Sequence, residues 1–352
     1  MTLYPKLILD ALATVRYPGT GKNLVEAEMV ADNLRIDGMS VSFSLIFEKP
    51  TDPFMKSMIK AAETAIHTYV SPDVQVAIAT ESRQAARPEP GKLLPLVKNV
   101  IAVSSGKGGV GKTSLALNFG IRLKLAGAKV LFVDMDPQCN LTYIMGIDEA
   151  PVTVYDLLTG QSDVREAILH TGEADLIAAS PALSTLNLSL NGPGREYLLR
   201  NALQPIVGEY NFIVIDSPPT LGILTINILT AADSVIIPAL ADVFSLQGVG
   251  QLYMTIQTVQ ANSNPKLRIA GIVLSRHTDR LLLNREMKEM LRNTAEQMHT
   301  KVFESVIRES VIVRESQAMR QSIFKYSARS RQTEDYDRFA LEYLQGAGYL
   351  NN

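Results

Sequence analysis

The sequence predicts an α/β protein in which a small α/β domain precedes a larger domain built on a mostly parallel, helix-covered sheet. From residue 98 onward, short and wholly apolar runs alternate with helical runs, which is typical of strands that helices cover on both faces. Residues 1–85 instead combine alternating strand patterns with amphipathic helices. Residues 86–97 carry three prolines and a glycine, and we expect a linker there. The larger domain would then span residues 98–352.

Hydrophobic spacing places the expected elements in order along the chain. In the small domain we expect helices over residues 5–15 and 52–69. We expect strands there over residues 27–38, 39–49 and 74–80. In the larger domain the expected strands are residues 99–105, 129–136, 175–180, 212–219, 234–240, 268–275 and 301–307. A helix is expected over residues 113–127, and a last one over residues 333–344 that buries Tyr336, Phe339, Ala340 and Tyr343 along one face.

The composition excludes several classes of protein. The chain has one cysteine, Cys139, so an intramolecular disulfide is excluded and a reducing compartment is favoured. One thiolate also cannot hold an iron–sulfur cluster within a single chain. No apolar run reaches the length of a membrane span, and residues 1–12 lack the basic start and apolar core of a signal peptide. We therefore expect a cytoplasmic protein.

Residues 104–118 read SSGKGGVGKTSLALN and contain the pattern G-x-x-x-x-G-K-[ST] between an apolar strand and a helix. Glycines let successive N–H groups turn toward phosphate oxygens, and the helix N-terminus adds partial positive charge. Lys112 would reach the β- and γ-phosphates, and the Thr113 hydroxyl would hold Mg²⁺. The motif predicts a P-loop NTPase fold, with a nucleotide cradle formed by Gly106, Lys107, Gly108, Gly109, Val110, Gly111, Lys112, Thr113 and Ser114.

A second lysine, Lys107, distinguishes this loop from an ordinary phosphate loop. The segment KGGVGKT resembles the deviant Walker A loop of the ParA/MinD/Mrp group of ATPases. The resemblance implies that Lys107 reaches across a homodimer interface to the nucleotide of the partner subunit. A cation supplied in this way stabilises phosphate charge only when two subunits meet. A solvated surface lysine is the alternative interpretation.

Two carboxylates, Asp134 and Asp136, end the run KVLFVDMD, at the strand end where α/β folds place ligand chemistry. The segment DMDPQCN resembles the ParA segment D-x-D-P-Q-G-N. The resemblance implies that Asp136 positions or activates the attacking water and that Asp134 is more structural. Cys139 stands where ParA proteins usually carry glycine, and we expect a buried, unreactive thiol there.

The run FIVIDSPPTLG has the form of a Walker B strand, whose carboxylate, Asp216, would support Mg²⁺ together with Thr113. The alternative is an aspartate that caps the following helix. Because no N/T-K-x-D guanine-reading motif occurs in the sequence, we expect ATP rather than GTP as the nucleotide.

The C-terminal region is basic, although the whole chain has a net charge of −2. Between Lys266 and Arg331 there are 14 Lys and Arg against seven Asp and Glu, a local charge of +7 that leaves −9 for the rest of the chain. Such a block favours contact with a phosphate backbone. Because the acids are interleaved, a solvated surface with many salt bridges is the alternative.

Residues from about 113 to 352 are similar to ParA/Soj partition ATPases. The resemblance implies an ATP-bound dimer that binds DNA non-specifically, associates with the nucleoid, hydrolyses ATP slowly and is stimulated by a ParB-like protein. It places a DNA-binding arginine at Arg280, and further candidates at Arg308 and Arg314. The last helix has an acidic polar face, unlike the membrane helix of MinD-type proteins, so we expect it to pack on the core and not on a membrane.

Residues 1–112 resemble the N-terminal half of Mrp-type iron–sulfur carrier ATPases, which suggests a hybrid joined within the phosphate loop. An Mrp-type carrier is therefore the alternative function. That group holds a bridging cluster through a C-x-x-C pair, and this chain has none. A third interpretation is a binding adaptor that uses ATP only to dimerise, with membrane or protein cargo.

Overall fold

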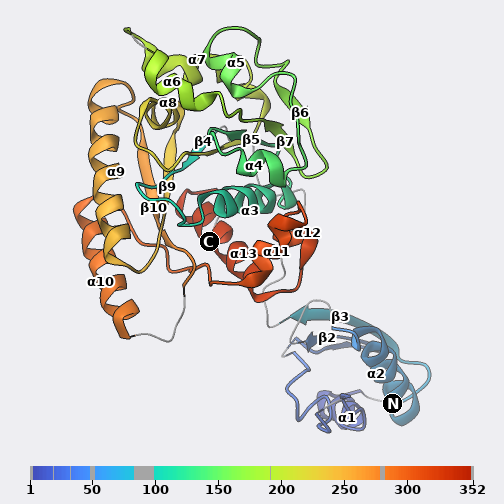
Figure 1. Cartoon of the computed structure of the whole chain (residues 1–352). Coiled ribbons are helices and arrows are strands. Elements are labelled where there is room, and N and C mark those ends of the chain that lie inside the picture. Colours follow the sequence, from blue (N-terminus) through green and yellow to red (C-terminus); the bar gives the residue numbers. More distant parts are fainter. Residues whose placement is uncertain are drawn as a thin grey trace. The chain divides into compact units, whose positions relative to one another are not determined.

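The computed structural model describes residues 3–18, 20–31, 33–47, 52–82, 99–190, 192–277 and 282–349. The chain divides into two compact units, Met1–Pro88 and Glu89–Asn352 (Figure 1). The predicted α/β class, with a P-loop NTPase fold in the larger unit, is confirmed.

The smaller unit holds a three-stranded sheet in the order β1-β2-β3. Strand β1 (Arg35–Asp37) is antiparallel to β2 (Ser40–Phe47), and β3 (Gln75–Ser82) is parallel to β2. Two helices, α1 (Pro5–Leu12) and α2 (Met55–Tyr69), contribute apolar side chains to a core shared with β2. Both predicted helices and two of the three predicted strands are confirmed.

The strand predicted over residues 27–38 is wrong except at its end. Residues 24–28 form turns instead, because the Asn23 side chain accepts hydrogen bonds from the N–H groups of Val25 and Glu26. Val30 makes only an isolated bridge to Leu45. Glu28 has a φ of 51°, which no strand residue adopts. Local side-chain hydrogen bonds of this kind compete with a strand ladder.

The larger unit contains, within its described residues, a seven-stranded sheet in the order β10-β9-β4-β8-β5-β7-β6. All neighbouring strands are parallel except β6, which is antiparallel to β7. The strands are β4 (Asn99–Val103), β5 (Val130–Asp134), β6 (Ile168–His170), β7 (Asp175–Ile177), β8 (Phe212–Asp216), β9 (Ser234–Ala239) and β10 (Arg268–Leu274).

Six of the seven strands predicted here are confirmed, and the run over residues 301–307 is not a strand. It lies beside β10 and makes an isolated bridge at Val302. The N–H groups of Glu304 and Ser305 donate to the Glu342 carboxylate at 2.9 and 2.8 Å, which interrupts the backbone hydrogen bonds that Phe303 and Ile307 donate to β10. The edge strand β6 was not predicted, because its three residues are too few to show a period.

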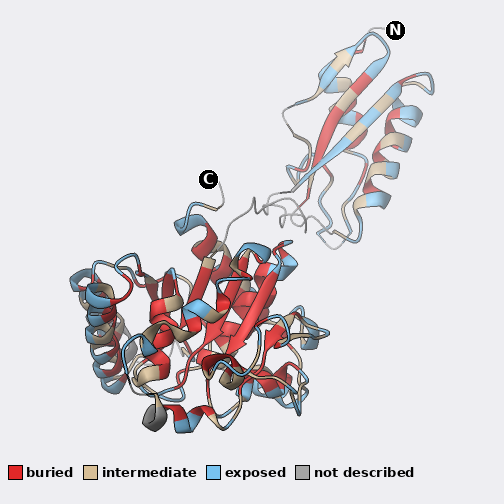
Figure 2. Cartoon of the chain, turned by 90° about the horizontal axis from the view of Figure 1, so that it is seen from above, coloured by how far each residue is buried: buried red, intermediate tan, exposed pale blue. Residues whose placement is uncertain are grey.

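Helices cover both faces of this sheet, and alternate residues of the central strands face opposite clusters of apolar side chains. Figure 2 shows these strands buried along their length. One face is covered by α3 (Lys112–Leu125), α4 (Asn140–Ile144), α11 (Val311–Ala318), α12 (Ile323–Tyr326) and α13 (Arg331–Gly346). The other face is covered by α5 (Val154–Leu158), α6 (Leu183–Ser189), α7 (Leu198–Leu203), α8 (Ile223–Ala231), α9 (Val243–Asn262) and α10 (Leu282–Gln297).

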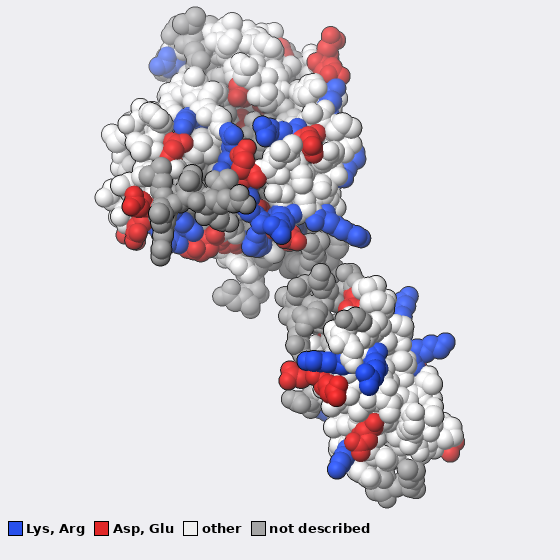
Figure 3. All heavy atoms as spheres, turned by 60° about the horizontal axis from the view of Figure 1, so that its bottom comes forward, with Lys and Arg blue, Asp and Glu red and all other residues white. Residues whose placement is uncertain are grey.

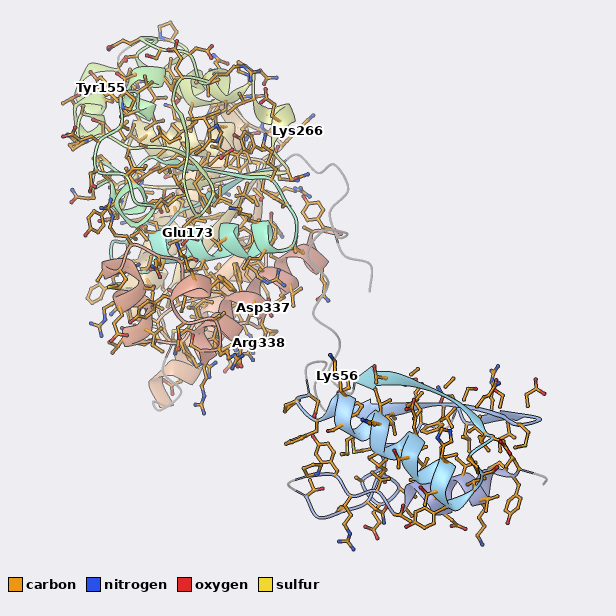
Figure 4. All side chains as sticks on the ribbon, turned by 90° about the vertical axis from the view of Figure 1, so that its right-hand side faces the viewer. Lys56, Tyr155, Glu173, Lys266, Asp337 and Arg338 are labelled. Carbon is orange, nitrogen blue, oxygen red and sulfur yellow. The ribbon has the colours of Figure 1, made fainter. Side chains whose placement is uncertain are left out.

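The last helix, α13, packs on the core as its amphipathic pattern predicted. Tyr336, Phe339, Ala340 and Tyr343 are all buried. The ring of Phe119 in α3 lies 5.5 Å from that of Phe339 and 5.0 Å from that of Tyr343. An ion pair between Arg122 of α3 and Asp337 of α13 adds to this contact; Figure 4 labels Asp337 on the ribbon of α13. Among the described residues, no helix has the length and apolar character needed to cross a membrane.

Candidate nucleotide site

The phosphate loop joins β4 to α3 at the carboxyl edge of the sheet. Gly109 and Gly111 adopt φ values of 74° and 86°, the left-handed region in which glycine has no steric penalty. Such alternation turns successive N–H groups toward one side of the loop. Helix α3 begins at Lys112, directly after Gly111, so its N-terminus faces the concave side and favours an anion.

Gly106 brings the loop directly against α9. A Cβ atom at Gly106 would lie 2.2 Å from the carbonyl oxygen of Gly248 in α9, so a side chain there would force one backbone away from the other. The loop is therefore built between β4 and α9, and its shape depends on this contact.

Lys112 is 7% exposed, and its ammonium donates to Ser105 Oγ at 3.3 Å and to the Lys107 carbonyl at 3.2 Å. Burial lowers the pKa of Lys112, against the opposing effect of the nearby carboxylates of Asp216 and Asp136. The structure thus brings Lys112 together with Asp136 and Asp216, three of the residues that the sequence singled out. A buried cation flanked by two carboxylates suits a ligand that carries both phosphate and a metal ion.

Asp216 ends β8, next to Asp134 at the end of β5. It is fully buried, and neither of its carboxylate oxygens has a hydrogen-bond partner among the described residues. Burial, with the negative charge of Asp134, raises the pKa of Asp216 well above its usual value. The Thr113 hydroxyl and the positive charge of Lys112 lower this pKa, but by less. Unpartnered carboxylate oxygens beside a threonine hydroxyl fit Mg²⁺, which prefers oxygen ligands. The capping alternative is wrong, because α8 begins after Gly222.

Asp134 and Asp136 differ in their surroundings. Asp134 accepts hydrogen bonds from the Thr142 N–H at 2.8 Å, the Thr142 hydroxyl at 2.7 Å and the Asp136 N–H at 3.1 Å. Burial raises the pKa of Asp134 to about 6. It therefore joins β5 to the start of α4. Asp136 accepts from the Gln138 N–H at 3.0 Å and lines the cavity beside the loop, where it can reach a bound molecule.

Cys139 occupies a left-handed backbone position, with a φ of 55°, which glycine adopts without strain. The thiol is half-buried and points toward the Pro137 carbonyl oxygen, 3.5 Å away. Burial and the charges of Asp134 and Asp136 raise the pKa of the thiol to about 11. A raised pKa disfavours the reactive thiolate, as expected for an unreactive cysteine, although the thiol is half-buried and not fully buried as predicted.

A cavity of about 610 Å³ opens beside the phosphate loop, within the range of small-molecule sites. Beyond the loop, its walls include Gln138, Asn140, Tyr143, Ser275, Arg276, Ile307, Glu309, Val313, Arg314 and Gln317. Gln317 of α11 donates to Ser114 Oγ at 2.6 Å. Sequence reasoning missed this wall. One sequence feature could have predicted part of this wall: Ser275 and Arg276 directly follow a parallel strand, at the edge of the sheet where ligands bind.

Lys107 lies outside the cavity and is not a free surface lysine. Its ammonium lies 3.0 Å from Asp242 Oδ2, at the N-cap of α9, and 5.5 Å from the ring centroid of Phe244. Phe244 is exposed. The Lys107 side chain is 31% exposed and is therefore accessible from solvent despite this pairing.

Of the three candidate DNA-binding arginines, the two that the structure describes differ in their exposure and in their ion pairs. Arg280 lies outside the described residues. Arg308 is held by Asp335, which is fully buried and also pairs with Arg338. Arg314 is exposed on α11 and lines the cavity with Arg308.

Comparisons with known proteins agree with this geometry. Residues 98–269 match the model of the AAA domain, and residues 6–78 match that of an iron–sulfur cluster assembly protein. The chain is 37% identical to the chromosome partitioning protein ParA of Myxococcus xanthus, over 71% of this chain and 89% of that protein. It is 38% identical to the sporulation initiation inhibitor protein Soj of Bacillus subtilis, over 69% and 97%.

A solved structure of cobyrinic acid a,c-diamide synthase from Mycobacterium smegmatis, with bound ATP analog and magnesium, is also similar. It has a TM-score of 0.61 and 32% identity, over 72% of this chain and 97% of that one. The front of the chain also matches a different family from the rest, in line with the hybrid interpretation. Through its larger unit, the chain belongs to the ParA/Soj family of partition ATPases.

Proposed function

We propose that this chain is an ATPase that uses ATP and Mg²⁺, dimerises when ATP is bound, and acts in the partition of a plasmid or chromosome. The observation that supports this most strongly is the convergence of Lys112, Asp136 and the unpartnered Asp216 on one phosphate loop. The similar synthase structure that holds an ATP analog and magnesium supports the same choice of ligands.

In this proposal each residue has a separate task. The N–H groups of the loop and the Lys112 ammonium bind the phosphates, and Thr113 and Asp216 hold Mg²⁺, which neutralises charge on the β- and γ-phosphates when bound. Asp136, at the cavity wall, orients the attacking water and accepts its proton. Asp134 accepts hydrogen bonds from Thr142. It therefore holds the segment between β5 and α4 in place and does not contact ATP.

Dimerisation follows from Lys107. In the ATP-bound dimer, Lys107 would leave Asp242 and reach a phosphate of the partner subunit's nucleotide. Because that contact exists only when both ATP and a second subunit are present, binding and dimerisation become linked equilibria. Hydrolysis would be slow in the chain alone and would be accelerated by a ParB-like partner.

We further propose that the dimer binds DNA without reading its sequence, in the cytoplasm and on the nucleoid, chiefly through Arg280 and Arg314. Arg308 is the weaker candidate, because the buried Asp335 holds its guanidinium. Figure 3 shows basic and acidic side chains interleaved on the drawn face of the larger unit, so binding would depend on a few arginines and on salt.

The test is DNA binding with and without ATP, at two salt concentrations, for the wild type, Lys107→Ala, Arg280→Ala and Arg314→Ala. Arg165→Ala, which removes an exposed arginine paired with Glu209, is the control. We expect the three test variants to lose DNA binding, and only Lys107→Ala to lose dimerisation as well. If Arg280→Ala binds DNA as the wild type does, the assignment of that arginine is wrong. A strictly monomeric ATP complex of Asp136→Ala would refute the dimer.

The smaller unit supports a second candidate, an iron–sulfur carrier, because residues 6–78 match an iron–sulfur cluster assembly protein. We also propose that residues 1–85 form this unit, residues 86–97 the linker and residues 98–352 the ATPase domain. One cysteine per chain provides two thiolates per dimer, short of the four that a cluster needs. Anaerobic reconstitution with iron and sulfide separates the candidates: a dimer that stays colourless and free of metal would exclude the carrier.

A further inference from the structure

Two carbonyl groups of the phosphate loop are held from outside by the residues that follow β10. Ser275 Oγ donates to the Val110 carbonyl at 2.6 Å, and Arg276 Nη1 donates to the Gly109 carbonyl at 3.0 Å. These consecutive carbonyls lie on the part of the loop where the φ values of Gly109 and Gly111 are positive.

The direction of these carbonyls matters for binding. A loop binds phosphate through N–H groups that point inward, so its carbonyls must point outward, where they need hydrogen-bond donors of their own. Val110 is buried, which limits the water available for that purpose. Ser275 and Arg276 supply donors at this place.

Arg276 is fixed in its position by three neighbours. Its φ is 50°, an uncommon value for a residue with a side chain. The backbone is held on both sides, because the Ser275 N–H donates to the Ala239 carbonyl and the His277 N–H donates to the Ile307 carbonyl, both at 2.9 Å. Its guanidinium also donates to the two carboxylate oxygens of Glu309 at 2.6 and 3.3 Å.

Glu309 lines the same cavity as Arg276. Arg276 therefore links the Gly109 carbonyl to Glu309, two groups that are far apart in the sequence. A bidentate arginine–carboxylate pair fixes the plane of the guanidinium as well as its position. That fixed plane keeps one N–H group directed at the phosphate loop.

We propose that Arg276, oriented by Glu309, is a positioning residue that keeps the phosphate loop in its nucleotide-binding shape. The inference rests on the proposed function, in which this loop binds ATP. It differs from a role in the reaction itself, because Arg276 would act through the Gly109 carbonyl. ATP and ADP both occupy the loop through their β-phosphates, so both should depend on Arg276 to a similar extent.

The test replaces Arg276 by asparagine, which tolerates a left-handed backbone but removes the guanidinium. We expect the dissociation constants of both MgATP and MgADP to rise on the order of tenfold, the loss of one hydrogen bond from a charged donor. KM should rise by a similar factor with little change in kcat. Arg276→Lys should restore part of the affinity, and Glu309→Gln should weaken binding less than Arg276→Asn does.

Arg165→Asn is the matched control, because Arg165 also pairs with a glutamate and its side chain is 58% exposed, against 51% for Arg276. It should bind both nucleotides as the wild type does. Unchanged affinity of Arg276→Asn for both nucleotides would overturn the inference. So would a fall in kcat with normal ADP binding, which would make Arg276 a residue that acts on the γ-phosphate.

If Arg276→Asn does not fold, Ser275→Ala and Glu309→Gln provide the same test, with weaker binding of both nucleotides expected and unchanged binding overturning the inference. A wild-type chain that binds neither nucleotide would refute the proposed function itself, which distinguishes that failure from failure of the role assigned to Arg276.

Discussion

Lys107 donates to both carboxylate oxygens of Asp242 within its own chain, at 3.1 Å to Oδ1 and 3.0 Å to Oδ2. The Lys107 and Asp242 side chains are 31% and 34% exposed, so solvent weakens the pair, and such pairs contribute about 0–1 kcal/mol. Asp242 also accepts from the Ser245 N–H at 2.7 Å as the N-cap of α9. Asp242 of the same chain therefore competes only weakly for Lys107, the lysine that we propose binds the nucleotide of the partner subunit.

Asp242→Asn should favour the ATP-bound dimer. Asparagine still caps α9, but it removes the negative charge that retains Lys107, so we expect dimerisation to tighten by about two- to fivefold. Sedimentation of the ATP-loaded chain in the Asp136→Ala background measures this. Lys107→Ala should be monomeric in the same experiment, and an unchanged or weaker Asp242→Asn dimer would contradict a competing role for Asp242.

Asp136→Ala should separate binding of ATP from its hydrolysis. We expect phosphate release to fall roughly 10²- to 10⁴-fold, the range attributed to a general base, while ATP affinity and thermal stability stay close to those of the wild type. Phosphate release and equilibrium binding of a fluorescent ATP analogue measure the two effects.

Asp134→Ala is the counterpart of that variant. It would leave three donors, from Thr142 and Asp136, without their acceptor, at a cost of about 1–3 kcal/mol for each buried group left unsatisfied. A lower midpoint of urea unfolding is therefore expected. If Asp134→Ala is as stable as the wild type but inactive, the structural and chemical tasks of the two aspartates are reversed.

Asp216→Asn should stabilise the nucleotide-free chain while removing its response to Mg²⁺. Burial raises the pKa of Asp216 above its ordinary value of 3.8. A raised pKa means that the protonated carboxyl contributes stability at low pH, and that this contribution is lost as the pH rises through the folded-state value. The free energy of unfolding of the variant should exceed that of the wild type by about 1–3 kcal/mol at pH 8, and the difference should shrink toward pH 4.

Thermal unfolding across this pH range, with and without MgADP, measures both effects for Asp216→Asn. MgADP should raise the midpoint of the wild type more than that of the variant. A variant that is less stable than the wild type at pH 8 would show that Asp216 has a structural partner and is not held ready for a metal ion.

Gly106→Ala and Gly108→Ala form a matched pair that tests the contact between the loop and α9. A Cβ at Gly106 would lie 2.2 Å from the Gly248 carbonyl oxygen, whereas one at Gly108 meets only Pro219 Cβ at 3.7 Å. We expect Gly106→Ala to lose about 1–3 kcal/mol of stability from overpacking, and Gly108→Ala to change it by less than about 0.5 kcal/mol. Urea unfolding measures both, and equal losses would contradict the tight apposition.

Local patterns predicted the parts of the site that are close in sequence. The strand, the glycine loop and α3 follow one another within residues 99–125, so their spacing alone indicates a phosphate site. The apolar runs that end in Asp134 and Asp216 were also recognisable, because both strands are buried on both faces. The turns before β1 and the segment at 301–307 were mispredicted, because side chains of Asn23 and Glu342 bind backbone groups there.

Residue types at short, regular spacing are sufficient to predict the fold class, the phosphate loop and the carboxylates around it. By contrast, the contact of Lys107 with Asp242, 135 residues away, and that of Arg276 with Gly109, 167 residues away, form only when the whole chain folds. These contacts depend on the strand order, which places β9 beside β4 and β10 beside β9. No local period encodes that order, because it results from how helices and strands pack over the whole sheet.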